Sequence, residues 1–174
     1  MEKVNKKFSG KEKYMRVYSI DKLKEAQFVK RLNYNYKLIY LLGCVTGLRI
    51  SDIVAMEKKV LNIKEPTIRE IKTGKSKRIY IPSKLRKELI EFSADNKKYI
   101  FESRSSTGHI TRQAVHKHFK KIAKEIRSKE NIGTHSMRKR YALMQKEKGK
   151  TYKYIKDKLN HNNLADTLLY LIKE

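Results

Sequence analysis

The spacing of apolar residues changes along the chain and predicts helices at both ends with a short sheet between them. Before residue 60 and after residue 82, apolar side chains recur every three or four positions, as on helices with one buried face. Between them, TIREIK and KRIYIP alternate apolar and polar residues on either side of Thr73 and Gly74, the pattern of an antiparallel hairpin. We therefore expect an α+β fold, mainly α, with a small three-stranded antiparallel sheet that has one basic face.

The expected helices carry recognisable start and stop signals. Thr111 and Thr134 are typical N-terminal capping residues, and Gly47 is a typical helix stop. The expected helices cover about residues 20–32, 35–46, a short segment beginning at 51, 83–93, 111–127, 134–148, 152–160 and 164–173. Short apolar segments at 60–63 and 99–101 are candidates for further extended structure.

Length and composition indicate one domain. A chain of 174 residues with 39% hydrophobic residues can fill one core and is too short for two. Residues 1–16 are polar and basic and are expected to form an N-terminal arm, so the domain would span 17–174. The single cysteine, Cys44, lies in an apolar stretch, and we interpret it as a core residue that has no disulfide partner within the chain.

The net charge points to a polyanionic partner. Lys and Arg number 43 against 18 Asp and Glu, giving a formal net charge of +25, and the basic residues are spread along the whole chain. Such an excess opposes its own compaction by self-repulsion and favours binding to DNA or RNA. A ribosome or an anionic membrane surface is the alternative partner.

Several kinds of segment are missing from the sequence. No apolar run approaches the roughly 20 residues that cross a bilayer, and the N-terminus lacks the apolar segment of a signal peptide. We therefore expect a cytoplasmic protein that does not enter a membrane. The Cys, His and carboxylate positions show no metal-ligand spacing, so we expect no metal and no other cofactor.

Two basic motifs are candidates for phosphate binding. His135 and Arg138 lie one turn apart near the start of an expected helix, where backbone N–H groups already favour an anion. Arg49 follows Gly47 at the end of an apolar helix, and Asp52 three residues later can orient it. Each motif alone also has a structural explanation: a solvated basic helix for His135 and Arg138, and a structural Arg–Asp pair for Arg49.

The remaining candidates are less specific by themselves. Lys72 leads into the expected hairpin turn, His161 lies at a helix break, and Tyr170 lies on the last expected helix, where an aromatic residue often simply packs. Neighbouring basic residues can contact a DNA backbone as readily as Lys72 can. The predicted DNA-contacting residues are Lys75, Lys77 and Arg78 of the hairpin and Arg112 and Lys117 of the 111–127 helix.

Taken in order, these motifs resemble the tyrosine recombinases, also called the phage integrase family. The resemblance runs from about Val17 to Lys173. The family pattern has a GLR motif followed by an acidic residue, a hairpin lysine, HxxR, a histidine in an LGH-like motif, and a tyrosine in a T-x-x-Y pattern. The matching catalytic residues are Arg49, Lys72, His135, Arg138, His161 and Tyr170, with Asp52 in support.

The sequence departs from the family pattern in several places. Asn160 stands where glycine is usual, and Asp52 stands where glutamate is common. Only about sixteen residues precede the catalytic-type region, where family members usually carry a helical core-binding domain that completes a clamp around DNA. The chain stops four residues after Tyr170, which puts the usual exchange of C-terminal helices between subunits in doubt.

The resemblance implies a mainly helical catalytic domain and a site-specific recombinase that works without metal. Arg49 and Arg138 would hold the scissile phosphate, and Tyr170 would attack it to form a 3′-phosphotyrosine. His135 would accept or orient the tyrosine proton, Lys72 (or Lys75) would protonate the leaving oxygen, and His161 would donate to a phosphate oxygen. The family also implies double-stranded DNA as the partner, with a monomer in solution and a tetramer on synapsed DNA.

Two other functions remain open at this stage. A type IB topoisomerase shares the chemistry but relaxes supercoils, and its domain is usually part of a much larger chain. A non-catalytic DNA- or RNA-binding protein would account for the net charge through phosphate contacts without any cleavage.

Overall fold

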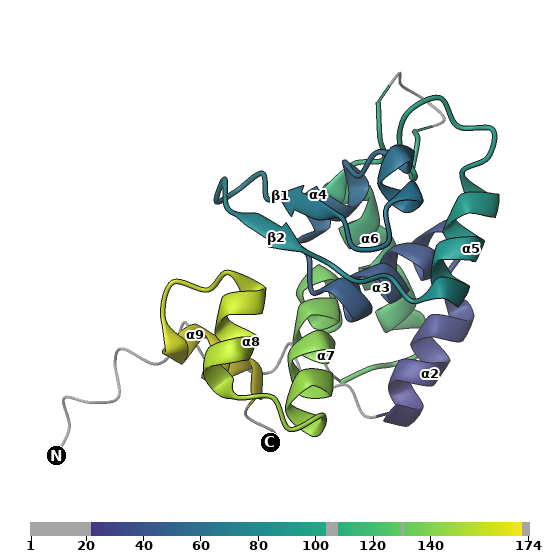
Figure 1. The fold of residues 1–174 in the computed structure, drawn as a ribbon. Helices are drawn as coiled ribbons and strands as arrows, with labels where there is room; N and C mark the ends of the chain where they lie inside the picture. The colour runs from purple at the N-terminus through teal and green to yellow at the C-terminus, as the bar shows by residue number, and fades with distance from the viewer. Residues whose placement is uncertain (1–21, 104–107, 130, 172–174) are drawn as a thin grey trace, which may run out of the picture.

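The structure is a computed structural model that describes residues 22–103, 108–129 and 131–171, without the side chains of residues 22, 169 and 170. The predicted N-terminal arm, residues 1–16, lies outside the described residues. Figure 1 shows the helices grouped around a short hairpin, with the C-terminal helices beside α7. In chain order the elements are α2 (Lys22–Arg31), α3 (Tyr34–Thr46), α4 (Ile50–Val54), the 3-10 helix η2 (Lys58–Asn62), β1 (Thr67–Arg69), β2 (Ser76–Arg78), α5 (Ser83–Phe92), α6 (Arg112–Glu125), α7 (Thr134–Glu147), α8 (Tyr152–Leu159) and α9 (Leu164–Leu171).

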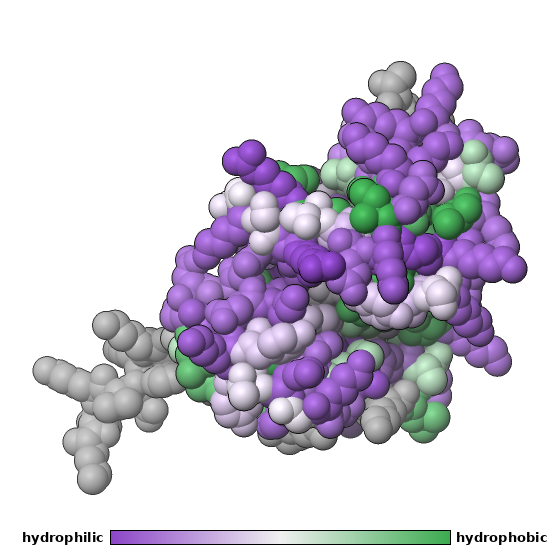
Figure 2. Space-filling model, viewed as in Figure 1, coloured by the Kyte–Doolittle hydropathy of each residue, from purple (hydrophilic) through white to green (hydrophobic). Residues whose placement is uncertain are grey.

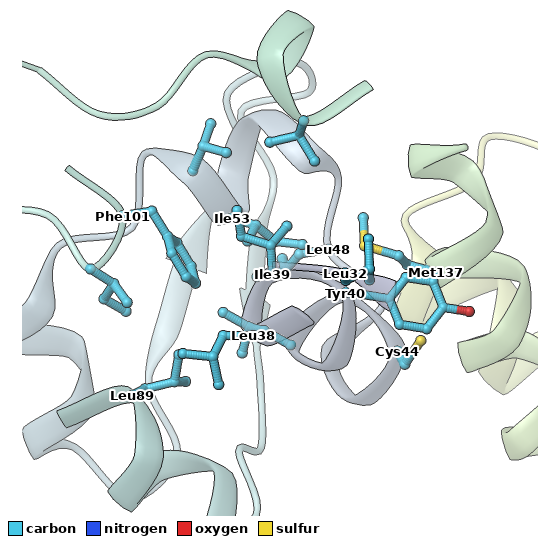
Figure 3. Close-up of a cluster of buried hydrophobic side chains, with 14 of the residues drawn as sticks. Leu32, Leu38, Ile39, Tyr40, Cys44, Leu48, Ile53, Leu89, Phe101 and Met137 are labelled. Carbon is cyan, nitrogen blue, oxygen red and sulfur yellow. The ribbon is translucent and has the colours of Figure 1, made fainter. Parts of the chain in front are cut away.

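The main apolar core surrounds α3, a strongly apolar helix. Leu38, Ile39 and Leu42 on α3 are fully buried, and side chains from α2, α4, α5 and α6 pack against them. Figure 3 shows this cluster, with Tyr40, Cys44 and Met137 meeting where α3 faces α7. Cys44 is buried there, as predicted, and burial raises the pKa of its thiol well above the usual value.

Two glycines let α7 approach α3 closely. A Cβ added to Gly43 would lie 2.5 Å from Met137 Sδ, which no real contact allows. Gly47 ends α3 in a left-handed conformation, φ +62°, and a Cβ there would lie 2.6 Å from the Tyr141 ring. The close approach matters for function because α7 carries the predicted HxxR motif and Gly47 lies two residues before Arg49.

The sheet differs from the prediction, because in the described residues it has two strands and not three. β1 and β2 pair antiparallel with Ile68 opposite Lys77. Residues 60–62 belong to η2 and not to a strand, and Ile63 follows its end, since only Leu61 in this segment is fully buried and no alternating face exists to pair. The 99–101 segment makes only an isolated bridge between Tyr99 and Glu57.

The C-terminal helices form a second, smaller apolar cluster. Its buried members are Tyr141, Ala142, Ile155, Leu159 and Leu171. Asn160 ends α8 in the left-handed conformation, φ 51°. After glycine, asparagine is the residue that tolerates this conformation best, so the Asn160 departure from the family pattern keeps the same backbone turn.

The predicted helices are all present, with ends within a few residues of those expected. Thr111 caps α6 as expected, accepting a hydrogen bond from the Ala114 N–H at 3.1 Å. At α7 the expected cap, Thr134, is instead the first helical residue, and Gly133 is the N-cap. The Gly133 N–H donates to Ser136 Oγ at 3.0 Å. The face in Figure 2 is largely hydrophilic, in keeping with the high charge. None of the described helices is both long and apolar enough to span a bilayer.

Candidate active site

Arg138 is the most deeply buried cation of the site and joins three segments. Its side chain extends from α7, and the residue is only 3% exposed. One guanidinium nitrogen donates to the Gly47 carbonyl at 2.6 Å, and the other donates to the Leu159 carbonyl at 2.8 Å. Arg138 therefore fixes the end of α3 and the end of α8 relative to α7, beyond any role in binding a ligand.

Arg49 lies between α3 and α4 and is held by a carboxylate. Its guanidinium pairs with Glu70 Oε2 at 2.5 Å, and the Thr73 hydroxyl donates to the same oxygen at 2.8 Å. Burial raises the pKa of Glu70, but the Thr73 hydrogen bond and the charges of Arg49 and Arg138 outweigh it and leave that pKa lowered. The Glu70 carboxylate thus interacts electrostatically with both Arg49 and Arg138, which the fold brings together from distant parts of the chain.

The carboxylate that pairs with Arg49 was not predicted. We expected Asp52 to orient Arg49, but Asp52 Oδ1 accepts the Ile71 N–H at 2.9 Å and so anchors the hairpin. Burial raises the pKa of Asp52. The sequence did contain a signal for Glu70. In the alternating segment TIREIK it lies two positions after Ile68, so the two side chains are on the same, inward face.

His161 connects Arg138 to α9. Its Nε2 lies 3.3 Å from a guanidinium nitrogen of Arg138, which can only donate, so Nε2 is the acceptor. Its Nδ1 then carries the hydrogen and donates to Thr167 Oγ at 2.9 Å. Burial and the positive charges of Arg138, Arg49 and Lys77 lower the pKa of His161 to about 3, so the ring is neutral.

His135 lies at the start of α7, one turn before Arg138. The residue is exposed overall, but partial burial of its ring lowers its pKa, and the charges of Arg138, Arg49 and Lys72 lower that pKa further. Lys72 itself is exposed on the turn after β1. The predicted hairpin lysine and the predicted histidine therefore lie close enough to interact electrostatically.

Tyr170 lies on α9, one turn after Thr167. Thr167 is completely buried and bonded to His161, so the backbone at residue 170 is near the site. The side chain of Tyr170 lies outside the described part of the structure, and its predicted role stays a prediction.

The predicted DNA contacts divide into exposed and buried residues. Lys75, Arg78, Arg112 and Lys117 are exposed, and Arg78 also pairs with Glu65 at 2.8 Å. Lys77 is different: it is only 5% exposed, so it cannot act as a surface contact with DNA. Its strand position explains this, since Lys77 and Ile79 both point inward while Arg78 between them points to solvent.

No metal-binding group appears in the described ranges. Within the part of the chain that the structure describes, no three His, Cys, Asp or Glu side chains lie together in a group that could hold a metal ion. What the site does contain is an excess of cations around two buried carboxylates.

Comparison with known proteins identifies the family of this chain. The model of the Phage integrase family matches residues 13–174. The chain belongs to the phage integrase family. A curated relative is the probable integrase/recombinase YoeC of Bacillus subtilis (strain 168), which is 28% identical over 159 residues, covering 89% of this chain and 87% of YoeC.

Solved structures of phage integrase family members share the fold. The crystal structure of XerA recombinase superposes with a TM-score of 0.75 at 15% identity, covering 91% of this chain and 61% of XerA. The Tn1549 transposon integrase in complex with transposon right-end DNA gives a TM-score of 0.72 at 14% identity, covering 91% of this chain and 62% of the integrase fragment in that structure. The chain thus spans less than two thirds of these two proteins, and its fold is that of a tyrosine recombinase catalytic domain.

Proposed function

We propose that this protein is a site-specific DNA recombinase that cleaves and rejoins DNA through a 3′-phosphotyrosyl intermediate. The observation that carries the proposal is the meeting of Arg49, Arg138 and His161 around one buried region, with α9 attached to it through Thr167. Two guanidinium groups in a partly dry site suit a phosphate whose charge grows during the reaction.

The proposed chemistry assigns one task to each residue. The Tyr170 oxygen attacks phosphorus, the bond from phosphorus to the 5′-oxygen breaks, and Tyr170 becomes linked to the 3′-phosphate. His135 accepts or orients the tyrosine proton. Its lowered pKa supports this task, because a neutral imidazole can accept a proton near pH 7. Lys72 donates a proton to the leaving 5′-oxygen.

Glu70 adds a feature that the family pattern did not supply. Its carboxylate pairs with one guanidinium nitrogen of Arg49. A phosphate in the site would share that guanidinium with Glu70, which lies on the same hairpin as Lys72.

His161 has a supporting task in the geometry described. Its Nε2 accepts from Arg138, so it holds the guanidinium in place. Donation from Nε2 to a phosphate oxygen, the role implied by the family resemblance, would require the ring to take up a proton or change tautomer.

The proposed partner is double-stranded DNA. The net charge of +25 and the exposed basic residues on the hairpin and α6 support it, as does the DNA bound to the Tn1549 transposon integrase. We propose a monomer in solution and four copies on two synapsed duplexes, acting in the cytoplasm. Affinity should fall steeply with salt, since log K changes by about −0.9 per phosphate contacted for each unit of log salt.

The test is a nicked suicide DNA substrate followed by denaturing electrophoresis. The wild-type protein should give a covalent DNA–protein adduct, and Tyr170→Phe should give none while keeping its DNA affinity. Tyr154→Phe, a change at another tyrosine of the C-terminal region, is the matched control and should form adduct normally. Binding without adduct on every substrate would instead favour a binding protein, and relaxation of supercoiled plasmid without strand exchange would favour a topoisomerase.

Two further variants separate chemistry from binding. Arg138→Ala should abolish cleavage while sparing most of the affinity, because one phosphate contact is lost among many. Lys72→Ala should cleave slowly on ordinary DNA and recover on a substrate with a 5′-thiol leaving group, which needs no proton. Rescue of Lys75→Ala in place of Lys72→Ala would move the proton donor to Lys75.

A further inference from the structure

Lys77 is a buried lysine whose ammonium has no hydrogen-bond partner among the residues that the structure describes. It is 5% exposed, and its Nζ lies 5.3 Å from the centre of the Tyr141 ring on α7. Lysine is almost never buried without a partner, because taking its charge out of water is unfavourable. A group that persists in this state points to a ligand that supplies the missing partner.

The surroundings of Lys77 identify the charge of that ligand. Several ionised groups act on its ammonium. They are Arg138 on α7, Glu70 after β1, Lys158 on α8 and Arg49 before α4. Three of these four groups are cations, so the net charge around Lys77 is positive and suits an anionic ligand.

We propose that Lys77 is a third cation of the phosphate-binding site and that a non-bridging oxygen of the scissile phosphate is its missing partner. The inference rests on the proposed recombinase function and deepens it. Lys77 neutralises charge on the phosphate and transfers no proton in the reaction, so its task differs from that of Lys72.

A proton-linked step in DNA binding follows from this placement. Burial, and then the charge of Arg138, lower the pKa of Lys77 to about 7, so most molecules carry a neutral amine at pH 8. A bound phosphate opposes both effects and raises that pKa. The free protein should therefore take up a proton at Lys77 when DNA enters the site.

The first test uses Lys77→Met, which keeps most of the volume and removes the charge, with Lys87→Met, a change at an exposed lysine of α5 outside the site, as the control. On ordinary DNA, Lys77→Met should cleave about 10²–10³-fold more slowly, the usual loss for one preorganised donor, while Lys87→Met stays near wild type. Thermal unfolding is measured alongside. Lys77→Met should melt at a higher temperature, since a buried amine without a hydrogen-bond partner is removed, whereas a lysine with a purely structural role would give a lower one.

The second test asks which oxygen Lys77 serves. A methylphosphonate at the scissile position replaces one non-bridging oxygen with a neutral methyl group. The Lys77→Met defect should shrink on at least one of the two diastereomers and should persist on the 5′-thiol substrate. Rescue by the thiol instead, or cleavage by Lys77→Met at the wild-type rate, would overturn the inference.

The closing experiment is calorimetry with the non-cleaving Tyr170→Phe protein, so it does not depend on catalysis. DNA binding is measured at pH 8 in buffers of different ionisation enthalpy. Tyr170→Phe should take up a larger fraction of a proton than the Tyr170→Phe, Lys77→Met double variant; equal uptake would overturn the assignment of Lys77. Failure of the proposed function would look different, with no adduct from the wild-type protein on any substrate.

Discussion

The apolar core around α3 and the cluster that holds α8 and α9 attach their helices in different ways. The α3 core draws buried side chains from α2 through α7, whereas the second cluster has five buried members beside the polar bonds of Arg138, His161 and Thr167. In Figure 1, α8 and α9 contact the rest of the molecule mainly along α7. The helix that carries the proposed nucleophile is thus attached through the active site itself, and we infer that it opens more easily than the core.

The sharpest way to break this comparison uses two isoleucines that are both fully buried. Ile39→Ala in the α3 core should lower the free energy of unfolding by about 2–5 kcal/mol and reduce hydrogen-exchange protection throughout the chain. Ile155→Ala in the second cluster should reduce protection in α8 and α9 first and leave the α3 amides nearly unchanged. Equal loss of α3 protection in both variants would mean that the two regions unfold as one unit.

A second prediction concerns the close contact between α3 and α7. Gly43→Ala places a Cβ where Met137 now lies, and should lower the free energy of unfolding by about 1–3 kcal/mol. Met137→Ala in the same chain should restore part of this loss, which a double-mutant cycle measures. Additive effects of the two changes would show that the contact does not limit the approach of α7.

A smaller effect is expected where His161 meets α9. Thr167→Val keeps the shape of the side chain but removes the acceptor for Nδ1–H, and should lower the free energy of unfolding by about 1 kcal/mol and slow adduct formation. Thr167→Ser keeps the hydroxyl and is the control. If Thr167→Val cleaves as fast as Thr167→Ser, the hydrogen bond from His161 does not position α9 for cleavage.

A further expected effect is a pH dependence of stability, which appears as a slope and not as a loss at one pH. The pKa of His161 is about 3 in the folded protein and 6.5 when the protein is unfolded. Between these two pH values the unfolded chain therefore binds more protons than the folded one. His161 therefore opposes folding increasingly as the pH falls from 6.5 to 3, and the free energy of unfolding rises with pH across that window. Thermal unfolding from pH 4 to pH 7 should show a shallower slope for His161→Gln than for the wild type, and parallel slopes would contradict the burial of a neutral ring.

The local patterns of the chain predicted its elements well. Helix periodicity and caps such as Thr111 act within one or two turns, so the sequence around each helix carries the information. The third strand was predicted wrongly, because Val60, Leu61 and Ile63 look like a strand by composition but only Leu61 finds a buried position. Strand pairing depends on a partner elsewhere in the chain, which no local pattern specifies.

The site shows the same division at the level of single side chains. The motifs identified Arg49, Arg138 and His161, and the fold brings them together as expected. The pairing of Arg49 with Glu70, where Asp52 was expected, and the burial of Lys77 depended on how the hairpin packs against α7.

By itself, then, the sequence determined the helices, the family and the residue types available for phosphate chemistry, because these follow from neighbours along the chain. Only the tertiary structure decided which carboxylate holds Arg49 and which lysine lies inside the site. A strand register and a helix approach of a few ångströms set whether a charge faces water or another charge, and that difference governs both its pairing and its pKa.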